Sequence, residues 1–206
     1  MPPAAPLILA SQSPRRAQLL RDAGFDFEQR SPPYADPDQP PDHLKVHEAE
    51  AYAVSLALKK VQSLGVLLVC HPATILAADT ICVDDRGRLV GKPADRDHAE
   101  AMIRSFIGTT HRVITGVAVM SISEEPREPI EPFADTATVT FGRVTDAQLA
   151  DYLDTDDWQG KAGGYNLFDR QAAGWPITVE GDPATVVGLP MRRLVPLLHA
   201  SLNSGR

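Results

Sequence analysis

The sequence predicts an α/β fold in which one mixed β-sheet is flanked by helices. Short apolar runs rich in β-branched residues alternate with segments of helical periodicity along the chain. A length of 206 residues suits one domain, and no internal repeat or linker divides it. The composition, 43% hydrophobic and 23% charged, is ordinary for a soluble globular protein. We therefore expect residues 1–206 to form a single domain.

The first half of the chain opens with a short apolar strand and a well-capped helix. Ser13 is a favourable N-cap, Pro14 suits the first helical turn, and Gly24 suits the position after the last turn. A proline-rich loop over 31–37 precedes a long helical pattern. The elements predicted here are a strand at 7–10, a helix at 14–23, a strand at 25–28, a helix at 41–65 and a strand at 66–69.

The second half is predicted to contain a hairpin, further strands and three helices. The best candidate for the central strand is 74–83, which turns at 84–87 and returns through 88–90. Asp95 or Asp97 caps the next helix, and Thr145 begins another with a capping-box pattern. The remaining elements are a helix at 99–106, strands at 111–120 and 135–144, a helix to Tyr152, strands at 177–180 and 185–187, and a helix after Pro190.

Composition excludes several classes of function. The net charge of −7 argues against binding a nucleic acid polymer, which needs a basic surface. The N-terminus lacks a secretory signal pattern, and no segment approaches about 20 consecutive apolar residues, so we expect a cytoplasmic protein with no membrane partner. Cys70 and Cys82 lack the spacing of a zinc ribbon or a disulfide framework. A small anionic ligand remains compatible, provided that cations gather locally.

Asp79 stands in the middle of the apolar strand predicted at 74–83. Burying an ionised carboxylate costs several kcal/mol or more unless a cation, a metal or hydrogen-bond donors meet it. We therefore interpret Asp79 as a catalytic or metal-binding carboxylate. The alternative is a hydrogen-bonded aspartate at a strand end.

Cations stand at positions that suggest an anion site. Arg15 and Arg16 occupy the first turn of the helix behind Ser13, where the helix dipole favours anions. Lys92 follows the hairpin and Lys161 begins a glycine-rich turn. Alternatively, these side chains point into solvent. His43 and His47 have the spacing of a metal pair, but without a third ligand we favour surface histidines.

Together with Lys60 on the long helix, these cations could hold a polyphosphate while Asp79 binds metal or activates water. This combination favours metal-assisted hydrolysis of a phosphoanhydride. A protein that only binds a sugar phosphate or a nucleotide explains the same cations. The common phosphate-loop, dinucleotide and serine-nucleophile motifs are absent.

Six motifs follow one another between residue 7 and about residue 198: Ser11–Arg16, Ala78–Thr80, Gly91–Pro93, Gly108 with His111 and Thr115–Gly116, Lys161–Tyr165, and Val187–Pro190. Together and in this order they resemble the Maf family of nucleoside triphosphate pyrophosphatases, some first described as septum-formation inhibitors.

The resemblance implies an elongated, curved mixed sheet flanked by helices, with two lobes around a central cleft, as in inosine triphosphate pyrophosphatases. It also implies a divalent cation (Mg²⁺ or Mn²⁺) and a homodimer. The implied reaction converts a nucleoside triphosphate and water to a monophosphate and pyrophosphate, with attack at the α-phosphorus. The alternative is a nucleotide-binding regulator of septum formation with little turnover.

Residue roles follow from the same resemblance. Asp79 matches the family's proton acceptor, acting directly or through the metal, and Asp36 lies where many members have a glutamate that could join it at the metal. Arg15 and Thr80 match positions linked to substrate choice. The other predicted substrate-binding residues are Ser13, Arg16, Lys60, Lys92 and Lys161.

Two positions depart from the family pattern. Phe168 replaces a glutamine that helps members specific for dTTP and UTP to recognise the base, so its ring either stacks on a base or belongs to the core. Gly160 stands where an aspartate is usual. The base preference therefore stays open.

Overall fold

The computed structural model describes residues 5–37, 44–68, 71–122 and 129–203. In this part of the chain, seven strands form one sheet: β1 (Leu7–Ala10), β2 (Glu28–Arg30), β3 (Ala73–Val83), β4 (Leu89–Val90), β5 (Thr110–Ile122), β6 (Phe133–Phe141) and β7 (Ile177–Glu180). The helices are α1 (Pro14–Asp22), α2 (Val46–Gly65), α3 (Arg96–Phe106), α4 (Asp146–Leu153), α5 (Leu167–Ala172), α6 (Pro183–Val187) and α7 (Met191–Asn203). Two short 3₁₀ turns are η1 (Val66–Leu68) and η2 (Ala162–Gly164).

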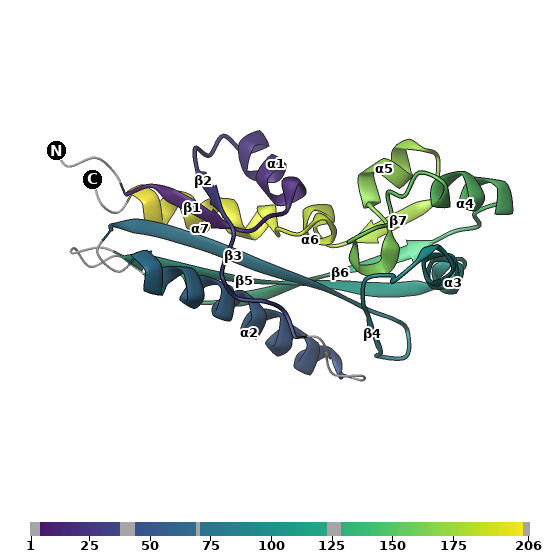
Figure 1. Cartoon of the computed structure of the whole chain (residues 1–206), viewed down its shortest axis with the longest axis horizontal. Helices are drawn as coiled ribbons and strands as arrows, with labels where there is room; N and C mark the ends of the chain where they lie inside the picture. Colours follow the sequence, from purple (N-terminus) through teal and green to yellow (C-terminus); the bar gives the residue numbers. More distant parts are fainter. Residues whose placement is uncertain (1–4, 38–43, 69–70, 123–128, 204–206) are drawn as a thin grey trace.

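The sheet is mixed, as predicted. Its strand order is β2-β1-β3-β5-β6-β7, with β4 paired to β3. β1 runs parallel to both β2 and β3, and every other pair is antiparallel. The long strands β3, β5 and β6 extend along the molecule and make it elongated (Figure 1). These features confirm the predicted fold class.

Helices cover both faces of the sheet. α2 lies on one face, whereas α1, α6 and α7 lie on the other, and α3, α4 and α5 gather at one end (Figure 1). Alternate residues of β3 divide between the two layers: Ile75 and Ala77 pack with α2, and Leu76 and Ala78 pack with α1 and α7. By the same alternation, Asp79 belongs to the α2 face and Thr80 to the α1 and α6 face.

Gly116 allows α2 to approach the sheet closely. It lies opposite Asp79 in the β3–β5 register. A Cβ atom at Gly116 would fall 2.3 Å from the backbone carbon of Ala53 in α2. Only glycine accommodates this contact, which brings the helix that carries Lys60 against the strand that carries Asp79.

Most predicted elements are confirmed, including the hairpin, the Asp95 cap and the Thr145 capping box. The strand predicted at 25–28 begins three residues later, because only Glu28–Arg30 pairs with β1. The long helix begins at Val46 instead of residue 41; residues 41–43, including His43, lie outside the described part of the chain.

Two predicted strands are wrong. Residues 66–68 form η1, because the Val66 N–H continues the helical bonding to Gln62, and Val66 remains 76% exposed. Val69 and Cys70 are not described. Residues 185–187 belong to α6, whose N-cap Asp182 accepts a hydrogen bond from the Ala184 N–H with Pro183 in the first turn. The prediction lacks two elements that follow Lys161, the 3₁₀ turn η2 and the helix α5.

By length and composition alone, His47–Leu68 would suffice to cross a membrane, with a hydropathy of 1.2. Core helices of folded proteins meet the same criterion. Ala57, Val61 and Leu64 of this segment are buried against β1, β3 and β5, so sheet packing accounts for its apolar side.

Candidate active site

The cleft lies at an interruption along one edge of β3. β1 pairs with β3 only up to Leu76, and β4 resumes the pairing at Cys82. On that side of β3, residues 77–81 therefore have no partner among the described strands. β5 borders the other side of β3 throughout. Because the edge is open here, Asp79 and Thr80 reach one cavity from opposite faces of the sheet.

This cavity, of about 790 Å³, contains nearly all of the predicted site residues. Its walls come from the start of α1, the loop over 31–36, α2, β3, and the loops that carry Lys92 and Lys161. The predicted residues that line it are Ser13, Arg15, Arg16, Asp36, Lys60, Asp79, Thr80, Lys92 and Lys161. Phe168 is not among the lining residues, and its side chain on α5 is 45% exposed.

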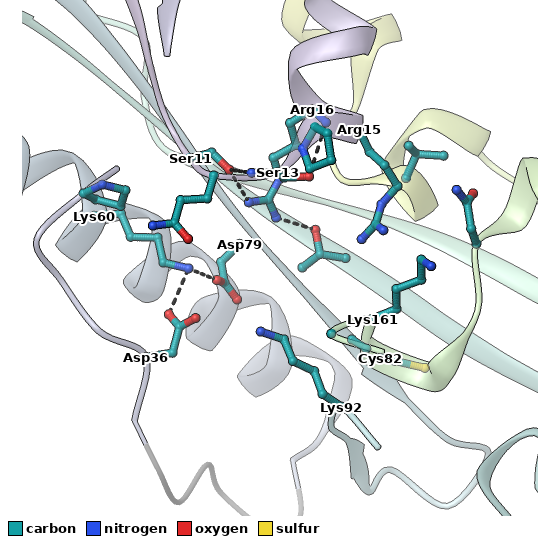
Figure 2. A pocket seen from close by; sticks show the side chains of 18 of the residues that line it. Ser11, Ser13, Arg15, Arg16, Asp36, Lys60, Asp79, Cys82, Lys92 and Lys161 are labelled. Atoms are coloured by element: carbon teal, nitrogen blue, oxygen red, sulfur yellow. Dashed lines mark hydrogen bonds and ion pairs between the residues drawn. The ribbon is translucent and has the colours of Figure 1, made fainter. Parts of the chain in front are cut away.

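Two carboxylates and a lysine form one wall. The Lys60 ammonium donates a short hydrogen bond to Asp79 Oδ1 and lies 2.8 Å from Asp36 Oδ1 (Figure 2). Asp79 and Lys60 are buried, whereas Asp36 is half exposed. Burial raises the pKa of Asp79, and Lys60 and then Arg16 oppose that rise. Asp79 is thus a buried carboxylate held next to cations, as the sequence hypothesis required.

Arg16 is fixed by bonds to three separate segments. Its Nε donates to the Gly188 carbonyl at 2.9 Å, Nη1 to Ser11 Oγ at 3.3 Å, and Nη2 to Thr80 Oγ1 at 3.0 Å. A Cβ atom at Gly188 would lie 3.0 Å from Nε, so glycine gives the guanidinium its room. Burial lowers the pKa of Arg16 and Asp79 raises it, but a guanidinium stays charged in proteins. The helix start is therefore a rigid cationic wall.

Further cations face the carboxylates across the cleft. Arg15, Lys92 and Lys161 point into it from the side opposite Asp36 and Lys60 (Figure 2). Burial lowers the pKa of both Arg15 and Lys161, and Arg15 also lowers that of Lys161. Cations that are placed so close together favour a multivalent anion between them.

The glycine turn after Lys161 is fastened to its surroundings. The Gly163 N–H donates to the Gly91 carbonyl at 3.0 Å, which joins the Lys161 turn to the loop before Lys92. Gly163 has φ +76°, a conformation that glycine adopts without strain. The two lysines therefore come from bonded loops and keep their relative places.

Several cleft residues escaped assignment from sequence. Ser11 is buried and accepts hydrogen bonds from the Ser13 N–H and from Arg16. It belongs to the Ser11–Arg16 motif, but the sequence alone gives it no separate role. Tyr165 lines the cleft and shares a 2.8 Å hydrogen bond with buried His111, whose pKa burial lowers to about 4. A polar residue in a β-branched strand was the available signal for His111.

The carboxylates also fit a divalent cation. Asp36 and Asp79 converge on one point, now occupied by the Lys60 ammonium, and Mg²⁺ commonly uses one or two carboxylates together with substrate phosphates. No group of three His, Cys, Asp or Glu ligands occurs within the described residues. The donor set thus suits a metal that the substrate helps to hold.

Residues 6–201 match the family described as Maf-like protein. The chain belongs to the Maf family. It is 39% identical over 197 residues to a dTTP/UTP pyrophosphatase of Salinibacter ruber, an alignment that covers 95% of this chain and 91% of the relative. It is 40% identical to one of Lacticaseibacillus casei (94% and 98% covered) and 38% identical to one of Symbiobacterium thermophilum (93% and 92% covered).

In this Maf protein, the two departures from the family pattern differ in position. Gly160 lines the cleft with φ +67°, so it serves a turn that an aspartate would strain. The exposure of Phe168 shows that the expected core alternative for its ring is wrong. Stacking on a base remains a prediction.

Proposed function

We propose that this protein hydrolyses nucleoside triphosphates to monophosphates and pyrophosphate. The observation that carries this is one cleft in which the carboxylates of Asp79 and Asp36 face the cations Arg15, Lys92 and Lys161. Family membership and relatives named as dTTP/UTP pyrophosphatases support the same class.

In the proposed reaction, a water oxygen forms a bond to the α-phosphorus. The bond from that phosphorus to the bridging oxygen breaks, and its electron pair leaves with pyrophosphate. Asp79 accepts the proton of the water; burial raises the pKa of its carboxylate, which makes it a stronger base than an exposed aspartate. Arg15, Lys92 and Lys161 hold the phosphate oxygens and stabilise the charge that develops on them.

A divalent cation fits this scheme. Asp79 and Asp36 would hold it, and it would neutralise phosphate charge when bound. Without a metal, Lys60 holds both carboxylates through the contacts described above, and a cation at their shared point would take the place of its ammonium.

For the substrate, we propose uridine and thymidine triphosphates first, because the relatives carry those names. Phe168 lies outside the lining residues, so stacking would require a base at the outer rim of the cleft, towards α5. If Phe168→Gln leaves the preference among UTP, dTTP, CTP and GTP unchanged, this stacking does not occur.

The test measures pyrophosphate released from these nucleotides with Mg²⁺ or Mn²⁺. We expect turnover by the wild type and a loss of about a hundredfold or more in Asp79→Asn, in the range of a removed general base. The matched control is Asp154→Asn, an exposed aspartate paired with Arg96. If the wild type turns over none of these nucleotides faster than Asp79→Asn does, and both rates are negligible, the proposal is refuted and a nucleotide-binding regulator with little turnover is favoured.

A further inference from the structure

Thr80 is the most exposed residue of β3, and it lines the cleft. Among the described residues, two protein groups form hydrogen bonds with the Thr80 hydroxyl: Arg16 Nη2 at 3.0 Å and Thr115 Oγ1 at 2.9 Å. A hydroxyl has one proton and two lone pairs. The direction of each bond therefore decides what Thr80 can offer a ligand.

The proton of Thr115 fixes the direction of the Thr80–Thr115 bond. Thr115 Oγ1 lies 2.8 Å from the Thr185 carbonyl oxygen, and a carbonyl oxygen only accepts, so Thr115 donates there. With its single proton committed, Thr115 can only accept from Thr80. Arg16 can only donate to Thr80. Thr80 thus directs its proton away from the cleft and retains one unused lone pair.

This arrangement resists rotation of the Thr80 hydroxyl. Thr115 is fully buried, so it lacks water as a substitute partner. The Thr185 hydroxyl donates a short hydrogen bond to Asp135, which holds Thr185 from a second direction. Reversing the Thr80 proton would leave the buried Thr115 oxygen without a donor.

We propose that Thr115 is a positioning residue which fixes Thr80 as a hydrogen-bond acceptor, so that Thr80 recognises an N–H or O–H donor of the nucleoside. Ionised phosphate oxygens carry no proton and cannot donate to it. A nucleoside triphosphate supplies such donors only from its sugar hydroxyls and base N–H groups. This inference rests on the proposed function and assigns Thr80 to the nucleoside part of the substrate.

Binding of donor-depleted nucleotides tests the assignment. Affinities are measured by calorimetry in an Asp79→Asn background, so that the nucleotide is not consumed. UTP is compared with 3-methyl-UTP, which lacks the base N–H, and with 2′,3′-dideoxy-UTP, which lacks the sugar hydroxyls. We expect one analogue to bind about tenfold more weakly than UTP, the value of one hydrogen bond. The analogue affected identifies the donor as base or sugar.

Variants then assign the penalty to Thr80 and its neighbour. In Thr80→Val the penalty should fall below about twofold, because the acceptor is gone. Thr115→Val should reduce it as well, since the Thr80 proton is then free to turn, whereas Thr115→Ser should retain it. The matched control is Thr110→Val, which removes a hydroxyl from the exposed Thr110–Thr140 pair between β5 and β6 and should retain the full penalty.

The outcomes are separable. A penalty unchanged in Thr80→Val, or no penalty for either analogue, would overturn the assignment of Thr80. A full penalty in Thr115→Val would overturn the positioning role of Thr115. Should Thr115→Val fail to fold, the Thr80→Val comparison still decides the acceptor role. Absence of pyrophosphate release by the wild type would instead refute the proposed reaction, without affecting these binding ratios.

Discussion

Replacing Lys60 with methionine removes the cation that joins Asp36 to Asp79. The side chains of Lys60 and Asp79 are each 11% exposed, so the variant leaves a buried carboxylate without its main partner. Removing one partner of a buried ion pair commonly destabilises a protein by about 3–5 kcal/mol. We expect about 3 kcal/mol, near the lower limit of that range, because Asp79 borders the cleft and Arg16 continues to attract it.

Thermal unfolding of metal-free protein measures this effect. For a chain of this size, about 3 kcal/mol corresponds to a Tm lower by roughly 6–12 °C. The double variant Lys60→Met/Asp79→Asn should recover most of the loss, because the unpaired charge is gone. The matched control is Lys59→Met, a neighbouring exposed lysine, which we expect within about 0.5 kcal/mol of wild type.

The loss in Lys60→Met should also depend on pH. Burial raises the pKa of Asp79, and removing Lys60 removes the main opposing interaction. For a carboxyl group with a pKa higher in the folded than in the unfolded state, protonation favours folding. The deficit should therefore shrink in acid and grow as pH rises through the folded pKa. A Lys60→Met variant as stable as wild type at neutral pH would refute the reasoning, and so would a double variant that recovers none of the loss.

Two further predictions concern the sheet and the cations. Gly116→Ala should destabilise the protein by about 3 kcal/mol in urea unfolding, because its Cβ would overlap the Ala53 backbone. The control Gly91→Ala places its Cβ in open space and should cost much less. Equal urea midpoints for the two variants would contradict this packing. Lys161→Met should raise the KM for UTP about tenfold or more, because a charged contact with the phosphates is lost. The surface variant Arg104→Gln should leave the KM unchanged. An unchanged KM in Lys161→Met would show that Lys161 does not contact the phosphates.

Local patterns were sufficient for much of the fold. Ser13, Asp95 and Thr145 each cap a helix as expected, because a cap depends on a few neighbouring residues. The predictions failed where tertiary context decided the outcome: the apolar residues after Gly65 continue a helical turn, and 185–187 are helical. For residues 185–187, the β-branched side chains favour a strand, whereas Asp182 and Pro183 just before them are typical of a helix start.

The site shows the same limit. The sequence indicates each cation separately, at a helix start or at a turn, but only the fold brings the four together in one cleft. They are Arg15, Arg16, Lys92 and Lys161. Alternation along a strand places the neighbours Asp79 and Thr80 on opposite faces.

Their meeting in one cleft depends on the open edge between β1 and β4. Neither that interruption nor the hydrogen bonds of Thr80 with Thr115 and of Thr115 with Thr185 has a local sequence signature.

The most direct test of the central claim is to hydrolyse UTP in water enriched in ¹⁸O and to analyse both products by mass spectrometry. Attack at the α-phosphorus places the label in uridine monophosphate and leaves pyrophosphate unlabelled, which is the result that the cleft predicts. Label in pyrophosphate, or orthophosphate as the first product, would contradict the account.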